Sequence, residues 1–141
     1  MLSLGSNGDF KFETAIFKIF GRHARIHTFD CTIGSAVPPM LSGVVTYHQI
    51  CVGVPERTDR KGRQFLSWGS LMDRLQAAGQ LVGKVEMMKI DVEGHERNFL
   101  WDMMTRGDAR RVGPTRAYCP TTTLAPCVLP VHPPPHAFPQ V

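Results

Sequence analysis

Apolar positions in the first hundred residues recur with two different periods. Short apolar or β-branched runs predict four strands, at residues 1–4, 25–29, 44–52 and 85–90. Spacings of three and four residues predict amphipathic helices between and after these strands. Strands that alternate with helices pair in a parallel sheet through right-handed crossovers. The pattern therefore predicts an α/β fold.

Three amphipathic helices are expected, and glycines end the first two, at Gly21 and Gly79. The second helix begins at a capping serine, Ser67 or Ser70. The charged segment 55–63, which precedes that serine, is predicted to be an exposed loop. The third helix runs from about residue 95 to residue 104. The apolar positions that define the three helices are Phe12, Ala15, Ile16, Ile19 and Phe20; Leu71, Leu75 and Ala78; and Phe99 and Met103.

The composition changes after about residue 105. Residues 113–141 hold most of the 11 prolines and show neither strand alternation nor a helical stripe. Proline removes a backbone donor and restricts the residue before it. We therefore interpret residues 106–141 as a proline-rich, disordered tail that acts as a spacer, with a ligand for an SH3-like partner as the alternative. Residues 1–105 form the predicted domain.

Charge and cysteine usage narrow the function classes. The chain has 141 residues, a net charge of +4 and four cysteines without a C-x-x-C pair. These features favour one domain with reduced thiols in a cytoplasmic compartment, without a structural zinc or a disulfide framework. The arginines from residue 106 to 116 lack interleaved aromatics, so no nucleic-acid partner is expected. No apolar run is long enough for a membrane span, and no signal peptide is recognised.

Two candidate ligand-binding elements follow the first two strands. The carboxyl ends of parallel strands form the ligand-binding edge of such sheets. The loop Gly5-Ser6-Asn7-Gly8 lets the backbone approach a ligand closely, although a plain tight turn explains it equally well. Asp30 ends the second strand at the distance where a Rossmann-like unit places its ribose-binding acid. A turn-forming aspartate is the alternative.

A pair of acids follows the fourth strand. Asp91 and Glu93 come directly after it, and side-chain alternation places Lys89 and Asp91 on the same side. Carboxylates there suit a sulfonium, a substrate amine or general-base chemistry. Capping of the following helix is an equally good interpretation. The convergence of three such elements at one sheet edge is what favours a binding site.

Three segments of the chain together resemble FkbM-type methyltransferases, closest to the eukaryotic methyltransferase-like proteins. They are Leu2–Phe10 with Phe12 and Glu13, His27–Thr32, and Lys89–Glu96, and the resemblance extends over about residues 1–101. The last segment, K-I-D-V-E-G-H-E, is the most specific. The resemblance implies a class I, Rossmann-like fold and a methyl transfer that depends on S-adenosylmethionine. The acceptor is unknown; an oxygen of a sugar or of another small molecule fits the family.

The same resemblance assigns site residues. Gly5, Ser6, Asn7 and Gly8 would bind the cofactor, the two glycines lining its methionine part, and Asp30 would hold the ribose. Asp91 and Glu93 would border the methyl-transfer region as catalytic candidates, and no metal is implied. The glycine loop lacks the G-x-G-x-x-G spacing of dinucleotide folds, which disfavours an NAD-dependent dehydrogenase.

Two departures from the family are visible. Ser3 stands where many methyltransferases have an acid before the glycine loop. The family fold also continues with further strands, whereas this chain enters its proline-rich segment. A truncated domain, incomplete on its C-terminal side, is therefore expected, with the fourth strand as an open edge for self-association. A catalytically inactive, truncated protein that acts through partner binding is the alternative function.

Overall fold

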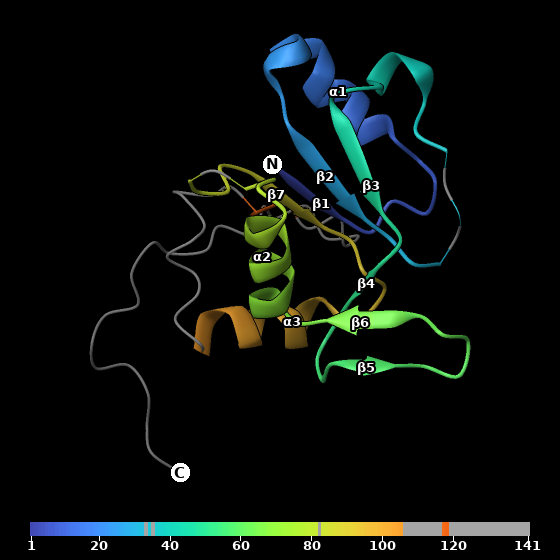
Figure 1. Cartoon of the computed structure of the whole chain (residues 1–141), viewed down its shortest axis with the longest axis vertical. Coiled ribbons are helices and arrows are strands. Elements are labelled where there is room, and N and C mark those ends of the chain that lie inside the picture. The colour runs from blue at the N-terminus through green and yellow to red at the C-terminus, as the bar shows by residue number, and fades with distance from the viewer. Residues whose placement is uncertain (33, 35, 82, 106–116, 119–141) are drawn as a thin grey trace.

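The computed structural model describes residues 1–32, 34, 36–81, 83–105 and 117–118 (Figure 1). In this part of the chain, the main sheet has the strand order β3-β2-β1-β7-β8, and its neighbouring strands are parallel. A smaller sheet has the order β4-β6-β5. Helices separate the central strands along the chain. The arrangement confirms the predicted α/β class with a parallel, Rossmann-like sheet.

The described residues form eight strands and three α-helices. The strands are β1 (Leu2–Leu4), β2 (Ile26–Phe29), β3 (Val45–His48), β4 (Cys51–Val52), β5 (Arg57–Thr58), β6 (Gln64–Leu66), β7 (Met88–Ile90) and β8 (Ala117–Tyr118). The α-helices are α1 (Lys11–Phe20), α2 (Trp68–Ala77) and α3 (Glu96–Thr105), and short 3₁₀ turns lie at Gly21–His23 and Pro39–Leu41.

Opposite faces of the main sheet carry different helices. Leu2 and Leu4 of β1 belong to one buried cluster with Leu71 of α2 and Phe99 of α3. A second cluster holds Ile26 of β2 together with residues of α1. Because side chains alternate along a strand, these two clusters lie on opposite sides of the sheet. The helices thus cover the faces, and the loops at the carboxyl ends of the strands meet at one edge.

The buried face of α1 differs from the predicted one. Ile19 and Phe20 are 71% and 51% exposed, whereas Glu13 and Ile16 are buried. The reason is a polar contact beneath the helix: Thr28 of β2 donates a hydrogen bond of 3.1 Å to the Glu13 carboxylate. This contact turns the Glu13 side of the helix toward the sheet. The predicted helix itself and its end at Gly21 are confirmed.

The predicted third strand is two strands. The first half, β3, pairs with β2, and the second half, β4, pairs with β6 in the smaller sheet. Only residues 49 and 50 separate them, and a tight turn forms there because the Ile50 N–H donates to the carbonyl oxygen of His48 at 2.8 Å. The run of strand-forming residues does not reveal that the chain passes from one sheet to the other. The reason is that backbone hydrogen bonding makes the turn, without glycine or proline.

The charged segment 55–63 is also more structured than a loop. It contains β5, which pairs antiparallel with β6. Asp59 organises the turn between them, because its Oδ1 accepts hydrogen bonds of 2.9 Å from the N–H groups of Lys61 and Arg63. An aspartate that bonds to nearby backbone N–H groups is typical of tight turns. The prediction of a loop was therefore wrong for residues 57–58, which form β5, whereas most of the segment is exposed as predicted.

The remaining two helices are confirmed, although Ala78 lies just past the end of α2 and is exposed. Ser67, and not Ser70, caps α2, and its hydroxyl accepts a hydrogen bond of 3.4 Å from the Ser70 N–H. Phe99 and Met103 are both fully buried on one face of α3.

The C-terminal prediction is corrected at one point. Residues 117–118 form β8, which pairs parallel with β7. Strand β7 is therefore paired on both sides and is not an open edge for self-association. The rest of the predicted tail and its arginines lie outside the described residues.

The cysteine prediction was wrong for one pair. Cys31 and Cys51 form a disulfide, with their Cα atoms 4.8 Å apart. Their separation of 20 residues matches none of the short cysteine motifs, and the strand order alone brings them together. In the described residues, no helix is long and apolar enough to cross a membrane. The same residues contain no group of three or more potential metal ligands.

Candidate functional site

A cavity of about 430 Å³ lies at the carboxyl ends of the central strands. Six of the seven predicted site residues line it: Gly5, Ser6, Asn7, Asp30, Asp91 and Glu93. Gly8 does not line the cavity. The glycine loop, Asp30 and the two acids were predicted to lie at one edge of the sheet. The structure brings all three elements together around this cavity.

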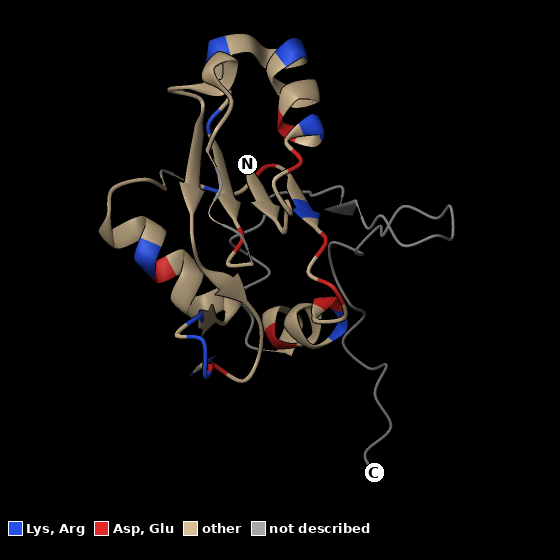
Figure 2. Cartoon of the chain, turned by 90° about the vertical axis from the view of Figure 1, so that its right-hand side faces the viewer, with Lys and Arg blue, Asp and Glu red and all other residues tan. Residues whose placement is uncertain are grey.

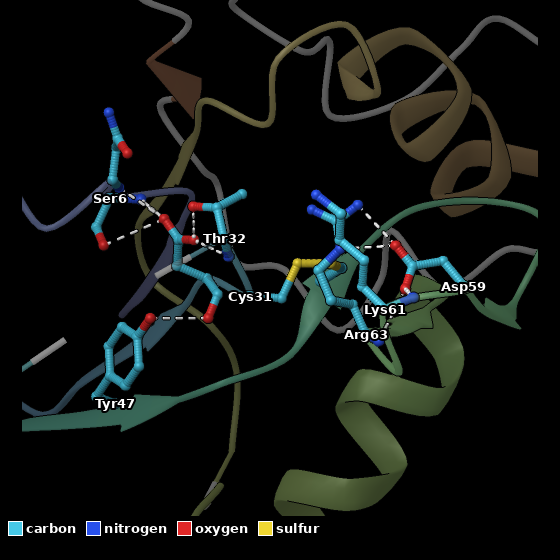
Figure 3. Close-up of a disulfide and its surroundings, with 10 residues drawn as sticks. Ser6, Cys31, Thr32, Tyr47, Asp59, Lys61 and Arg63 are labelled. Carbon is cyan, nitrogen blue, oxygen red and sulfur yellow. Dashed lines mark hydrogen bonds and ion pairs between the residues drawn. A yellow bond between two sulfur atoms is a disulfide. The ribbon is translucent and has the colours of Figure 1, made fainter. Parts of the chain in front are cut away.

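The Asp30 carboxylate organises the end of the cavity next to β1 and β2. Its Oδ2 accepts hydrogen bonds of 2.8 Å and 2.6 Å from the N–H groups of Ser6 and Asn7. Its Oδ1 accepts bonds of 2.8 Å and 2.6 Å from the N–H and the hydroxyl of Thr32. Asp30 thus connects the glycine loop after β1 to the loop after β2. Figure 3 shows Ser6 and Thr32 bonded to this carboxylate and Tyr47 bonded to the backbone carbonyl oxygen of the same residue.

These hydrogen bonds also set the charge of Asp30. Burial raises the pKa of the carboxyl group, but the donors from Thr32, Ser6 and Asn7 together lower that pKa below its ordinary value. The carboxylate is therefore ionised at neutral pH. The hydroxyl of Tyr47 donates to the Asp30 carbonyl oxygen at 2.8 Å. Burial, with a smaller contribution from the Asp30 charge, raises the pKa of Tyr47 to about 12, so this hydroxyl stays protonated.

The glycine loop passes close to the end of β7. Gly5 has a φ of +80°, and a Cβ atom there would lie 1.7 Å from the Asp91 carbonyl oxygen. Only glycine fits this close approach and this backbone conformation. Asn7 also has a positive φ, of 47°. The structure therefore explains Gly5 by its packing against Asp91, a reason that the glycine pattern alone does not reveal.

The acids after β7 line the cavity, and among the described residues neither accepts a hydrogen bond from the first turn of α3. The N–H groups of Val92 and Gly94 donate to the two carboxylate oxygens of Glu96, at 3.0 Å and 2.9 Å. Glu96 thus holds the loop that precedes α3 against the start of the helix. Glu93 has a φ of 50°, an uncommon conformation for a residue other than glycine.

Lys89 and Asp91 lie on the same side, as predicted. The Lys89 ammonium is 3.6 Å from the Asp91 carboxylate, which is 46% exposed. Asp91 therefore presents a partly solvated negative charge at the end of β7.

The opposite end of the cavity is built by residues that are not among the predicted ones. Arg63, Phe65 and His95 line it, and the disulfide cysteines lie between the two ends. The rings of Phe65 and His95 have centroids 5.8 Å apart. His95 belongs to the K-I-D-V-E-G-H-E run and follows the predicted acids closely in sequence. This position was the signal from which it could have been predicted as a site residue. Phe65 and Arg63 carried no such signal, because β6 comes to the cavity only through the smaller sheet.

Comparison with known protein families supports a methyltransferase. A family described as a methyltransferase domain matches residues 1–128. No curated protein and no solved structure matches the chain. The family match does not distinguish the FkbM type, which stays a hypothesis. Because the match covers most of the sequence, the chain belongs to this family of methyltransferase domains.

Proposed function

We propose that the chain is an S-adenosylmethionine-dependent methyltransferase that binds its cofactor at the carboxyl ends of β1, β2 and β7. The observation that carries this proposal is the convergence of the glycine loop, Asp30 and the acids Asp91 and Glu93 around one cavity. Its volume of about 430 Å³ lies in the range of small-molecule sites. Methyltransferases of this family generally use this cofactor, and the resemblance to FkbM-type enzymes supports the same choice.

The charges at this end of the cavity fit the cofactor. S-adenosylmethionine carries a positively charged sulfonium, and the carboxylates of Asp91 and Glu93 are acids of the opposite sign beside the cavity. It has no pyrophosphate, so it does not need a second and third glycine at dinucleotide spacing. The two glycine-loop N–H groups that bond to Asp30 hold the loop in shape for the methionine part of the cofactor.

Asp30 is the residue we assign to the ribose. Its two oxygens already accept four short hydrogen bonds, about the number that a carboxylate accommodates. A ribose hydroxyl therefore takes the place of one existing donor. The Thr32 hydroxyl is the exchangeable one, because the Thr32 N–H stays bonded to the same oxygen.

The bound cofactor supplies an electrophilic methyl group. The chain's own residues would hold the acceptor in line with it and keep water away. Asp91 and Glu93 line the same cavity, which supports assigning either carboxylate to accept the proton that an acceptor hydroxyl loses.

Calorimetric titration of the full chain with S-adenosylmethionine, and separately with NAD, tests the proposal. We expect binding of the first and not of the second. Asp30→Ala should weaken binding by at least tenfold, since the variant loses the charge-assisted hydrogen bond to the ribose and the bonds that hold the glycine loop in shape. Glu86→Gln is the matched control, because it removes one exposed carboxylate that precedes β7, away from the strand end with the cavity.

Two outcomes count against the proposal. One is the absence of S-adenosylmethionine binding by a chain whose circular dichroism shows a folded protein. The other is equal affinity in the Asp30→Ala and Glu86→Gln variants. A methyl-transfer assay on the binding-competent chain then separates an active enzyme from an inactive one.

A further inference from the structure

One face of the smaller sheet forms the wall of the cavity that lies opposite the acids. Phe65 of β6 is in register with Cys51 of β4 and with Arg57 of β5. Residues in register on neighbouring strands project from the same face. Cys51 and Phe65 both line the cavity. Arg57 is exposed and is not itself a lining residue, but it projects from the same face at the outer end of this row, at the rim of the cavity. The Arg57 guanidinium lies 3.9 Å from the centroid of the Phe65 ring.

The two arginines of this wall differ in their partners. Arg63 is held by Asp59, with both Nε and a terminal nitrogen 2.6 Å from the same carboxylate oxygen. In the described part of the chain, Arg57 makes no ion pair with a carboxylate; one of its nitrogens donates to the Pro55 carbonyl oxygen at 3.2 Å. A guanidinium has five N–H donors in a fixed fork. Arg57 therefore keeps donors and an uncompensated charge for a ligand.

The cavity is consequently asymmetric in charge. Asp30, Asp91 and Glu93 line the cavity, and Asp91 lies against Gly5 at the strand ends. Arg63 also lines it beside Phe65, and Arg57 lies over the Phe65 ring at the rim. In Figure 2 the loop between β5 and β6 is mostly blue, and the loop after β7 carries red segments. Figure 3 shows the disulfide between the Asp30 hydrogen-bond group and the Arg63–Asp59 pair. A ligand with a positive centre fits beside the acids, and a ligand with a negative group fits beside the arginines.

Open space beside Phe65 is kept by a glycine. A Cβ atom at Gly53 would lie 3.2 Å from a Phe65 ring carbon and 3.5 Å from Nδ1 of His95. Any larger residue would narrow the space between these two rings.

We propose that this wall is the methyl-acceptor subsite and that it selects an acceptor carrying an oxyanion, a carboxylate or a phosphate, which Arg57 binds while Phe65 packs against the acceptor body. This inference rests on the proposed function, because the acids at the other end are assigned to the cofactor. The acceptor then lies between the two ends, with its anionic group pointing away from Asp91 and Glu93 and its reacting oxygen toward them. The like charge of the acids disfavours the reverse orientation.

The test compares three probes that share one body: glucose, glucuronate and glucose 6-phosphate. Each is titrated into the full chain saturated with S-adenosylhomocysteine, and also into the chain without it, by ligand-observed NMR. We expect the two anionic probes to bind at least tenfold more tightly than glucose, since a charge-assisted bond to a guanidinium contributes that much. The ratio of the two anionic affinities distinguishes a carboxylate site from a phosphate site.

Two variants with the same change of charge complete the test. Arg57→Gln should remove most of the preference for the anionic probes. Arg60→Gln, which changes an exposed arginine on the turn after β5, should keep it. Binding of S-adenosylhomocysteine, measured in parallel, should be unchanged in both variants. This measurement reports on the proposed function independently of the acceptor probes.

The inference is overturned if glucose binds as well as its anionic analogues, or if Arg57→Gln and Arg60→Gln behave alike. It is also overturned if no probe binds to a chain that does bind S-adenosylhomocysteine. A different result would contradict only the proposed cofactor. In that case S-adenosylhomocysteine does not bind, but the anionic probes still bind more tightly than glucose and Arg57→Gln still removes this preference. The oxyanion site would then stand without the cofactor assignment.

Discussion

The side-chain ammonium of Lys89 donates a hydrogen bond of 2.6 Å to the carbonyl oxygen of Gly5. Lys89 is only 8% exposed, and Ser3 of β1 lies in register with it on the same face of the sheet. In the described part of the chain, the buried Ser3 hydroxyl and one oxygen of Glu13 have no hydrogen-bond partner. A polar layer therefore lies beneath the glycine loop, and Lys89 is the member of it that reaches the loop.

Replacing this lysine should destabilise the loop and the fold together. Lys89→Met leaves the Gly5 carbonyl without its donor and Asp91 without its cation. We expect a loss of about 1–3 kcal/mol in the free energy of unfolding, measured by urea titration, because an unsatisfied buried polar group costs that much. We also expect weaker S-adenosylmethionine binding. Lys18→Met, which removes an exposed lysine of α1, serves as the control; equal stability of the two variants would contradict the prediction.

Close packing at Gly5 can be separated from its backbone conformation. Gly5 and Gly43 have nearly the same φ, +80° and +78°, but only Gly5 has a neighbour, Asp91, in the space of a Cβ atom. Gly43→Ala should therefore lower the free energy of unfolding by about 1 kcal/mol, because of its strained φ alone. Gly5→Ala should cost at least about 2 kcal/mol more, because the strands must move apart. Urea unfolding of both variants measures the difference, and equal costs would show that the contact with Asp91 is unimportant.

The disulfide should contribute measurably to stability. Cys31 and Cys51 close a loop with a separation of 20 residues, for which the expected contribution is about 3 kcal/mol. A reducing agent should lower the free energy of unfolding of the natural chain by about this amount. The Cys31→Ser, Cys51→Ser double variant should not respond to the reductant at this bond. As a direct check, at most two of the four cysteines should react with a thiol reagent in denaturant; reaction of all four would contradict the bond.

Acid should destabilise the fold through His48. Burial, followed by the nearby charges of His27 and Arg74, lowers the pKa of His48 to about 4, whereas the unfolded chain has the ordinary value of about 6.5. Between these two values the unfolded chain binds a proton that the folded chain excludes, so stability falls as the pH drops through this window. His48 is partly exposed, so solvent screening weakens the effect of its pKa shift. We expect the shift to change the free energy of unfolding by about 1–2 kcal/mol.

Variants of two histidines test this pH dependence. His48→Gln should lose less stability than the natural chain between pH 7 and pH 4.5, as measured by urea unfolding at both values. His23→Gln, at an exposed position, should keep the natural pH dependence. The His48 ring stacks on Phe29, and removing that stack lowers the stability of His48→Gln equally at both pH values, so it cancels in the comparison. An unchanged pH dependence in His48→Gln would assign the effect to another group.

Local signals in the amino-acid sequence were enough for most individual elements. The apolar spacing of Phe99 and Met103, the cap at Ser67 and the stop at Gly21 each act within one or two turns of a helix, and all three are confirmed. The general rule for parallel sheets also placed the predicted strand-end residues around one cavity, apart from Gly8. These inferences succeed because periodicity and capping depend on residues that are close in sequence.

The partners of these residues depend on the three-dimensional fold. Local patterns were sufficient for the α/β class, most element positions and the candidate acids. Only the fold brought Cys31 to Cys51, turned β4 into a second sheet, gave the Asp30 carboxylate its donors and placed Phe65 and Arg57 opposite the acids. The physical reason is that strand order and register join residues tens of positions apart, and no local pattern of hydrophobic and polar residues encodes that pairing.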